Sequence, residues 1–246
     1  MKKVIFLPTV FLSCLLIAFS AEVHFSEKDD LYTIKLKDIG EVAASATAVF
    51  SADGKNFRTG TRDLPFQGEV RSTSVDTPFG RAIQVDRLYG KDDAPYQFTL
   101  RIRQLIDLDA ITFQGFLHNR SGKDLSLTSL EILDATTGVG RPNIGNPDDW
   151  LITPLMQHVH AESLADMNGG FNEVGLFFNT KTQKSFLIGP VGPAEAHCRV
   201  EVHNQRFKAY AQMDRVLVSP GETRRSEEIL LIAVYQDQKP VTLMRF

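Results

Sequence analysis

The sequence contains few cysteines and one tryptophan, and neither positive nor negative charge is in large excess. Two cysteines occur in 246 residues, so no disulfide framework can hold the fold together, and a hydrophobic core must do so. If the first 20 residues are a signal peptide, about 225 residues remain, which is enough for such a core in one domain. The formal net charge is only -3, and it argues against nucleic acid or an anionic membrane surface as a partner.

The N-terminus has the three parts of a secretory signal peptide. Lys2 and Lys3 precede an apolar stretch over residues 4–19, and small residues surround a cleavage point after Ser20. The stretch is short for a membrane span, which needs roughly 20 apolar residues, and Pro8 interrupts it. We therefore expect a signal peptide at 1–20, a secreted or periplasmic protein, and no stable membrane insertion after the signal is removed.

Removal of the signal changes both the charge and the cysteine count. Loss of Lys2 and Lys3 takes the net charge from -3 to -5. Cys14 is removed as well, and the single remaining cysteine, Cys198, cannot form a disulfide within the chain. Cys14 lies inside the apolar run rather than before polar residues, which disfavours lipidation as the alternative.

The sequence also lacks a sustained helical repeat. Apolar and polar residues alternate instead, as in residues 31–37, 97–103 and 111–118, and this period of two is typical of half-buried strands. Turn-forming segments separate these runs from six further strand-like ones at 126–133, 173–179, 185–189, 198–203, 215–218 and 228–235. The pattern predicts an all-β fold with two antiparallel layers, in a single domain over residues 21–246.

Alternation fails in the middle of the chain, where residues 138–170 are rich in glycine and proline. We expect a long irregular loop, and such loops are often functional. The only tryptophan, Trp150, lies in it next to Asp148 and Asp149. An exposed indole stacks on the apolar face of a sugar while carboxylates accept bonds from its hydroxyls. These three residues are our candidate sugar site; the alternative is that Trp150 fills one end of the sandwich.

The same loop carries the closest approach to a metal motif. In an extended chain His158, His160 and Glu162 would share one face, and two imidazoles with a carboxylate suit Zn or Fe. The alternative is a solvated edge. A similar alternation puts Cys198 on the apolar face of residues 198–203, which predicts a core residue rather than a nucleophile.

Motifs for other chemistry are missing. Paired carboxylates are adjacent in sequence and would point to opposite faces of a strand. Gly138-Val139-Gly140 is followed by no helix pattern, which excludes a dinucleotide fingerprint there, and we expect no cofactor. Asn119-Arg120-Ser121 matches a glycosylation acceptor, whose use depends on the source.

Three stretches together resemble a known family. They are FQGFLHNRSGKDLSLTSLEILD from Phe113, GLFFNTKTQKSFLIGPVGPAEAHCRVEV from Gly175, and VLVSPGETRRSEEILLIAVYQDQKPVTLMRF from Val216. Their order of hairpin, strand and Pro-Gly-Glu turn is similar to that of the N-terminal β-supersandwich domain of family-36 α-galactosidases (melibiases). The resemblance implies a galactose-mutarotase-like β-supersandwich.

The same resemblance implies no catalytic residue. The family's catalytic aspartates lie in a separate barrel, within motifs like Lys-Trp-Asp and Ser-Gly-Gly-Gly that this sequence lacks. We therefore expect a non-catalytic domain that acts in a carbohydrate context or beside a catalytic glycosidase domain or subunit. Two alternatives stay open: a stand-alone carbohydrate-binding protein, and a metal-dependent enzyme that uses His158, His160 and Glu162.

Overall fold

A computed structural model describes residues 21–136, 144, 146–154, 161–166, 169–172, 174–191, 196–203 and 205–234. Over these ranges the chain forms antiparallel strands and one short 3-10 helix, η1 (Pro147–Asp149), with no α-helix. None of the described segments is a helix long and apolar enough to cross a membrane. The signal-peptide prediction falls on residues 1–20, which lie outside the described part.

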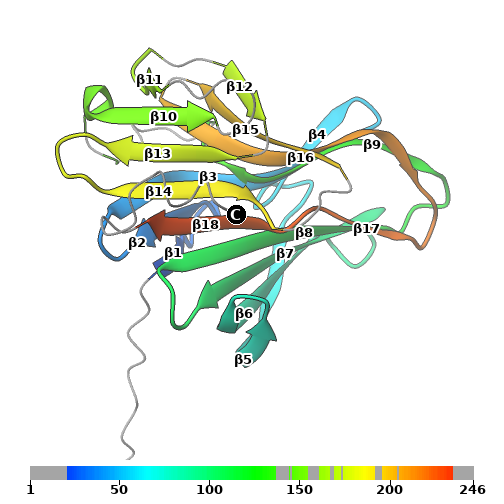
Figure 1. Ribbon diagram of the computed structural model, residues 1–246. Coiled ribbons are helices and arrows are strands. Elements are labelled where there is room, and N and C mark those ends of the chain that lie inside the picture. Colours follow the sequence, from blue (N-terminus) through cyan, green and yellow to red (C-terminus); the bar gives the residue numbers. More distant parts are fainter. Residues whose placement is uncertain are drawn as a thin grey trace, which may run out of the picture.

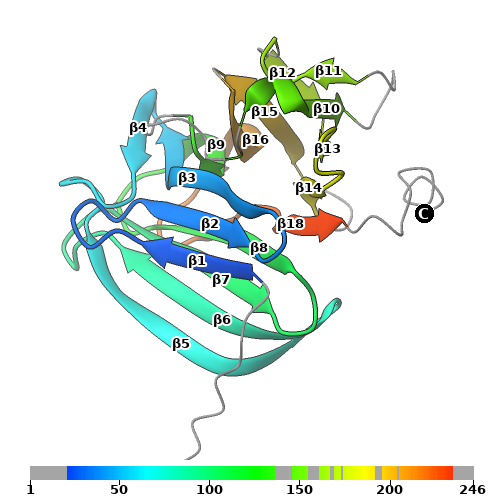
Figure 2. The same cartoon turned by 90° about the vertical axis from the view of Figure 1, so that its left-hand side faces the viewer.

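The strands form two sheets that face each other (Figures 1 and 2). The first has eight strands in the order β1-β2-β3-β9-β16-β15-β12, with β4 paired to β3. Its members are β1 (Ala21–Phe25), β2 (Tyr32–Leu36), β3 (Gly40–Ala52), β4 (Lys55–Arg58), β9 (Leu125–Asp134), β12 (Gly169–Asn172), β15 (His197–His203) and β16 (Arg206–Val218).

The second sheet has ten strands in the order β11-β10-β13-β14-β18-β8-β7-β6-β5, with β17 paired to β8. Its members are β5 (Phe66–Thr77), β6 (Gly80–Tyr89), β7 (Tyr96–Leu105), β8 (Ala110–Asn119), β10 (Trp150–Pro154), β11 (Glu162–Ser163), β13 (Gly175–Asn179), β14 (Ser185–Pro190), β17 (Thr223–Arg225) and β18 (Ile229–Val234).

Strand β18 connects the two halves of the ten-stranded sheet. One edge pairs with β14, where Leu231 lies opposite Ile188, and the other pairs with β8, where Leu231 lies opposite Ile111. Figure 1 shows it in the centre, between an upper group of strands that includes β10, β13 and β14 and a lower group that includes β5–β8. The sheet is continuous because this late segment fills the gap.

Alternation along the strands builds one core between the sheets. Residues 229, 231 and 233 of β18 are buried, and their neighbours are half-buried. Aromatic rings fill much of the interior: Phe177 stacks on Phe186 with 4.6 Å between ring centroids. The Tyr32 hydroxyl, buried in the same core, donates a hydrogen bond to the carbonyl of Ile132 in β9.

The predicted all-β fold with two antiparallel layers is confirmed, and most of the predicted runs are strands at nearly their expected bounds. Three features differ. The short strands β1, β4 and β17 were not predicted. The β5–β6 hairpin was also not among the predicted strands, because a β-bulge at Ser72–Val75 and frequent charged residues interrupt its alternation. The predicted irregular loop at 138–170 is partly wrong, since β10 lies within it and pairs with β13 along Trp150–Pro154.

Replacement of the central β18 side chain tests how far stability depends on this strand. Leu231 is fully buried, so Leu231→Ala is expected to lower the free energy of unfolding by about 2–5 kcal/mol. Leu217→Ala is the matched control, because Leu217 is 61% exposed and its truncation should change stability by less than about 0.5 kcal/mol. Urea denaturation measures both; equal effects would contradict the central role of β18.

Candidate functional site

Trp150 is a core residue, which corrects the sugar-stacking hypothesis. Its side chain is 3% exposed, and its ring meets Phe186 edge-on at 5.7 Å between centroids. The indole N–H donates a hydrogen bond to the carbonyl of Ile144. A buried indole with a satisfied N–H offers no free face to a sugar, and Trp150 fills the sandwich as the alternative predicted.

The two aspartates beside Trp150 form the short helix η1 but do not converge on a ligand. Asp148 is exposed, whereas Asp149 is half-buried and forms an ion pair with Lys181 at 2.8 Å. The carbonyl of Asp149 also accepts hydrogen bonds from the backbone and hydroxyl of Thr180. These contacts tie η1 to the turn after β13, which is a structural role.

The predicted metal site cannot be built from the described residues. His158 and His160 lie outside the described ranges, and Glu162 is half-buried in β11. Over the described part of the chain, no three His, Cys, Asp or Glu side chains are close enough to hold a metal ion. The histidine hypothesis stays a prediction.

Asn119, the predicted glycosylation acceptor, is fully buried. Its amide donates to the carbonyls of Lys123 and Val218, at 2.9 and 2.7 Å, and its oxygen accepts from the backbone and hydroxyl of Ser121. With every polar atom of the side chain in use inside the fold, this position is unsuited to carry a glycan.

A second apolar cluster lies on the outer face of the ten-stranded sheet, opposite the core. Its centre is the buried set of Ala82, Leu105 and Ala110, each at most 1% exposed. Half-buried Val75, Leu230 and Ile232 pack against this centre. Strand β18 is therefore apolar on both faces, a pattern that is typical of strands covered on both sides. We call these six residues the outer apolar cluster.

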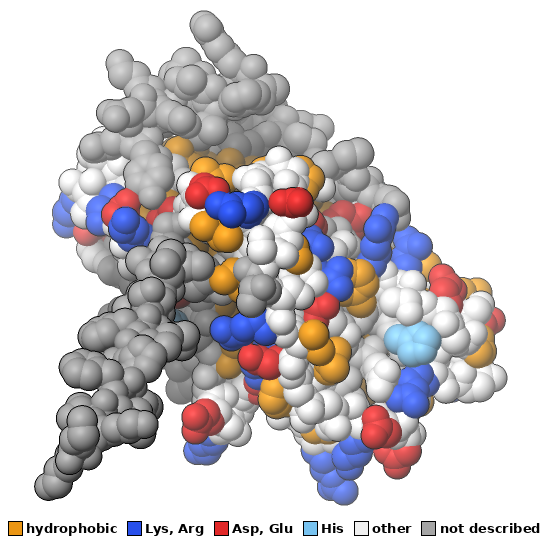
Figure 3. Space-filling view, turned by 90° about the horizontal axis from the view of Figure 1, so that it is seen from below, with side chains coloured by type: hydrophobic (Ala, Val, Ile, Leu, Met, Phe, Trp, Pro, Cys, Tyr) orange, Lys and Arg blue, Asp and Glu red, His pale blue; other side chains and the backbone are white. Residues whose placement is uncertain are grey.

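Charged hydrogen bonds flank the outer apolar cluster on one side. Arg103 in β7 donates to Glu228 at 2.7 Å and to Gln84 in β6 at 2.9 Å, and the Thr112 hydroxyl also donates to Glu228. An apolar centre with a satisfied polar border is the usual anatomy of a protein interface. In the view from below, Lys and Arg side chains lie among Asp and Glu side chains and isolated hydrophobic ones (Figure 3).

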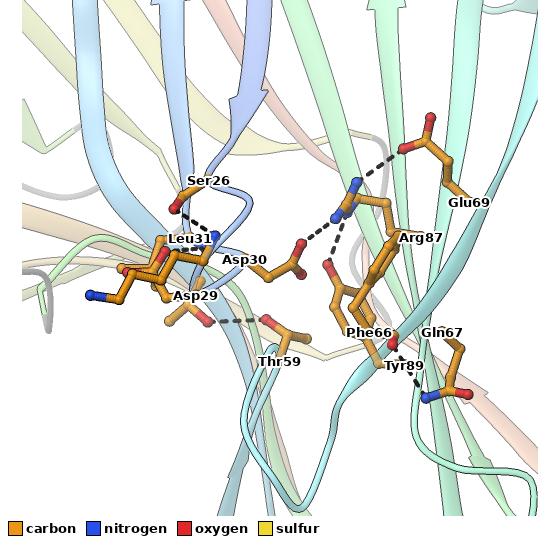
Figure 4. Close-up of polar contacts among 12 residues, drawn as sticks. Ser26, Asp29, Asp30, Leu31, Thr59, Phe66, Gln67, Glu69, Arg87 and Tyr89 are labelled. Carbon is orange, nitrogen blue, oxygen red and sulfur yellow. Dashed lines mark hydrogen bonds and ion pairs between the residues drawn. The ribbon is translucent and has the colours of Figure 1, made fainter.

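A buried arginine, Arg87, binds several polar side chains near the C-terminal end of β6 in the ten-stranded sheet (Figure 4). Arg87 in β6 is 7% exposed, and its three kinds of nitrogen each have a partner. Nη2 contacts the Asp30 carboxylate, Nη1 donates to Glu69 at 2.9 Å, and Nε donates to the Tyr89 hydroxyl at 3.2 Å. We call this set of four residues the Arg87 cluster.

Aromatic rings cover both sides of the Arg87 guanidinium. Its carbon lies 3.7 Å from the centroid of Phe25 and 4.1 Å from that of Phe66. Burial works against the charged guanidinium, but Tyr89 and Asp30 outweigh this effect and raise the pKa of Arg87. Burial and the Asp30 carboxylate likewise raise the pKa of the Tyr89 hydroxyl, which stays protonated.

The Arg87 cluster connects the turn between β1 and β2, in the eight-stranded sheet, to the edge of the ten-stranded sheet. Asp30 reaches Arg87 from a left-handed backbone conformation, with φ of 55°. Gly60 leaves room for this conformation. A Cβ at position 60 would lie only 2.6 Å from the Asp29 carbonyl oxygen and 2.9 Å from the Asp30 Cβ. Gly60 itself has φ of 77°, so it is needed both for its backbone angle and for space.

A surface cleft of about 620 Å³ borders the Arg87 cluster. One wall is the segment Phe25–Asp30, the other is formed by Pro65, Phe66, Gly68 and Glu69, and Gly60 and Arg87 complete the lining. This cleft was not predicted from the sequence. Its parts lie far apart in the chain, and Asp30 and Arg87 are separated by 57 positions. One local feature could have indicated a polar site here, namely the turn Lys28-Asp29-Asp30, which is rich in Asp and precedes an alternating strand.

A third polar cluster lies on the outer face of the eight-stranded sheet. Lys208 in β16 sits between Glu201 at 3.2 Å and Glu131 at 3.8 Å, and the Tyr210 hydroxyl donates to Glu201 at 2.6 Å. Burial raises the pKa of Glu131 despite Lys208 nearby. Burial acts the same way on Glu201, but the bonds from Tyr210 and Lys208 prevail and lower its pKa.

Removal of the Arg87 guanidinium should weaken the whole fold. Arg87→Met leaves the buried Asp30 carboxyl group without its ion-pair partner, so the free energy of unfolding should fall by about 3–5 kcal/mol. A double variant that adds Asp30→Asn should recover part of this loss, because Asn removes the charge and tolerates positive φ. Arg71→Met is the control: its ion pair is 63% exposed on the arginine side, and the effect should stay below about 1 kcal/mol.

Glu131 should make stability depend on pH. The folded state holds the Glu131 proton more tightly than the unfolded chain, whose ordinary value is 4.5. The free energy of unfolding should therefore contain a part that is present at low pH and is lost as pH rises from 4.5 through the raised folded pKa. Glu131→Gln should remove this decline in urea titrations at several pH values. Glu27→Gln, at an exposed site, serves as control, and identical slopes in wild type and Glu131→Gln would contradict the assignment.

The comparisons with known proteins give a likeness in fold. No protein-family model matches the chain, and no curated protein sequence does. Among solved structures, the GH36 α-galactosidase AgaA from Geobacillus stearothermophilus matches 79% of this chain with a TM-score of 0.52 and 12% identity. The α-galactosidase from Lactobacillus brevis matches the same share with a TM-score of 0.52 and 13% identity.

The galactosidase domain of the α-galactosidase-sucrose kinase AgaSK is a third match, over 77% of this chain, with a TM-score of 0.51 and 11% identity. This chain spans only 30% of the length of each of the three matched chains. At such identities the likeness establishes the fold alone. The predicted resemblance to the β-sandwich domain of family-36 α-galactosidases is confirmed at that level.

Proposed function

We propose that this chain is a secreted or periplasmic, non-catalytic β-supersandwich domain that works in contact with a glycoside-hydrolase catalytic unit. One observation carries the proposal: most of this chain matches less than a third of α-galactosidases that are much longer. In those proteins the matched fold belongs to a longer chain, and the remainder provides a neighbour. Whether that neighbour here is on the same chain or another is left to experiment.

The outer apolar cluster is the surface we propose for this contact. It extends from β18 across β8, β7 and β6 to β5, and it combines three buried residues with the half-buried side chains of Val75, Leu230 and Ile232. The ion-paired Arg103 and Glu228 at its border would fix the register of a partner without an unpaired charge. A catalytic unit is the occupant we propose because the matched enzymes are α-galactosidases.

Activity measurements separate this role from that of a complete enzyme. The purified chain should not hydrolyse an aryl α-galactoside. The carboxylates to substitute are Glu131 and Glu201, because both lie beside Lys208 and their pKa values are shifted in opposite directions. Turnover that disappears in Glu131→Gln or Glu201→Gln would overturn the non-catalytic role.

Docking is tested with the tagged protein purified under mild conditions from the cells that make it naturally. We expect α-galactosidase activity to accompany the wild type in a complex; if the activity lies on the same chain, the readout for the variants below is instead the thermal stability of the purified enzyme, which they should lower. Ile232→Lys should reduce the recovered activity at least about tenfold, because a charge would be buried at the contact. Val75→Glu is a second variant at the rim, and Leu217→Lys is the control on the other sheet. Wild-type protein that carries no glycosidase activity, or equal recovery with all variants, would contradict the proposal.

A further inference from the structure

We propose that the cleft beside the Arg87 cluster binds an uncharged saccharide of one or two rings. The cleft lies between the β1–β2 turn and the start of β5, away from β18, so this inference does not depend on the docking role (Figure 4). Its volume of about 620 Å³ is within the range of roughly 300–1,000 Å³ that is usual for small-molecule sites.

Phe66 supplies an aromatic surface in this cleft. Its side chain is 40% exposed, although it packs against the Arg87 guanidinium at 4.1 Å and against Tyr89 at 5.9 Å between centroids. These contacts hold the ring in place while much of it stays open. A ring that is already immobilised loses little entropy when the C–H face of a sugar packs on it.

Carboxylates at both walls provide acceptors for hydroxyl groups. Glu69 is oriented by Arg87 at 2.9 Å and by Arg71 at 3.5 Å, yet its side chain is 38% exposed. An ionised carboxylate has about four acceptor positions, so Glu69 can bind a ligand hydroxyl as well. On the opposite wall, a hydrogen bond from Ser26 lowers the pKa of the exposed Asp29, which keeps this group ionised.

The charges of the cleft disfavour an anionic ligand. The lining carries four carboxylates (Glu27, Asp29, Asp30 and Glu69) against two cations (Lys28 and Arg87). Arg87 donates to Asp30, Glu69 and Tyr89, and the two carboxylates balance its positive charge. Because the lining then keeps more negative than positive charge, a phosphate or a carboxylate is disfavoured.

A cationic ligand is disfavoured for a different reason. Aromatic rings and carboxylates together could hold an ammonium group, but the Arg87 guanidinium already occupies that position between Phe25 and Phe66. A second cation on Phe66 would lie close to this fixed positive charge. A neutral molecule with an apolar face and several hydroxyls fits the combination best.

The test is a titration followed by the amide resonances of the isotopically labelled, purified chain. The neutral probes are methyl α-galactoside, melibiose, maltose and cellobiose, and the charged probes are galacturonate and glucosamine. We expect saturable shifts at residues 26–30 and 66–69 with at least one neutral probe, and weaker binding of both charged probes.

Phe66→Ala should weaken this binding about tenfold, whereas Phe66→Tyr should retain it. Phe79→Ala is the matched control, because Phe79 is 36% exposed in the β5–β6 turn and does not line the cleft. Glu69→Gln is a second variant that keeps the shape of the side chain, and it should also weaken binding. Three results would overturn the inference: no saturable shifts with any neutral probe, tighter binding of a charged probe, or equal affinity in wild type and Phe66→Ala.

Discussion

The pairing of β18 with both β14 and β8 is the constraint on which the rest of the structure depends. Without it the ten-stranded sheet would end as two smaller sheets, each with an unpaired edge. The pairing joins residues that are distant in sequence: Leu231 lies opposite Ile111 on one side and Ile188 on the other. A segment that completes a sheet must also be apolar on its inner face, and here it is apolar on the outer face as well. The strand that joins the two halves of the sheet therefore also places the half-buried Leu230 and Ile232 on the outer face, where we propose that a neighbour docks.

Arg87 solves a related problem at the far end of the sheet. The edge strand β5 and the β1–β2 turn belong to different sheets, and the space between them has to be filled. A guanidinium between two phenylalanine rings fills this space, and Asp30, Glu69 and Tyr89 satisfy its hydrogen bonds. A charge in such a position is tolerated only when all its partners are present. The arrangement leaves Phe66 and Glu69 rigid and partly open, so a device that stabilises the edge also shapes the cleft.

Sequence alone predicted the class of fold because alternation is a local property. The strand at residues 198–203 shows this: Cys198, Val200 and Val202 are buried and the residues between them are not, as the pattern required. Trp150 was placed wrongly because a loop rich in Gly and Pro was taken as irregular, whereas Trp150–Pro154 pairs with β13. The Arg87 cluster could not be predicted at all, since nothing in the sequence around Asp30 indicates which of the arginines will meet it. Long-range register decides such contacts, and register follows from the complete sheet.

The two proposed surfaces need different support from the fold, and each lies where the fold provides that support. The outer apolar cluster, apart from Val75 on the edge strand β5, lies on strands that are paired on both sides, where a large and rigid partner finds a preformed surface. The cleft lies where an edge strand meets a turn, and its aromatic ring and carboxylates are fixed by one buried cation rather than by the sheet. A small ligand needs only these few oriented groups. Loss of Arg87 would therefore disturb the cleft far more than the β18 surface, so each surface can be altered without the other.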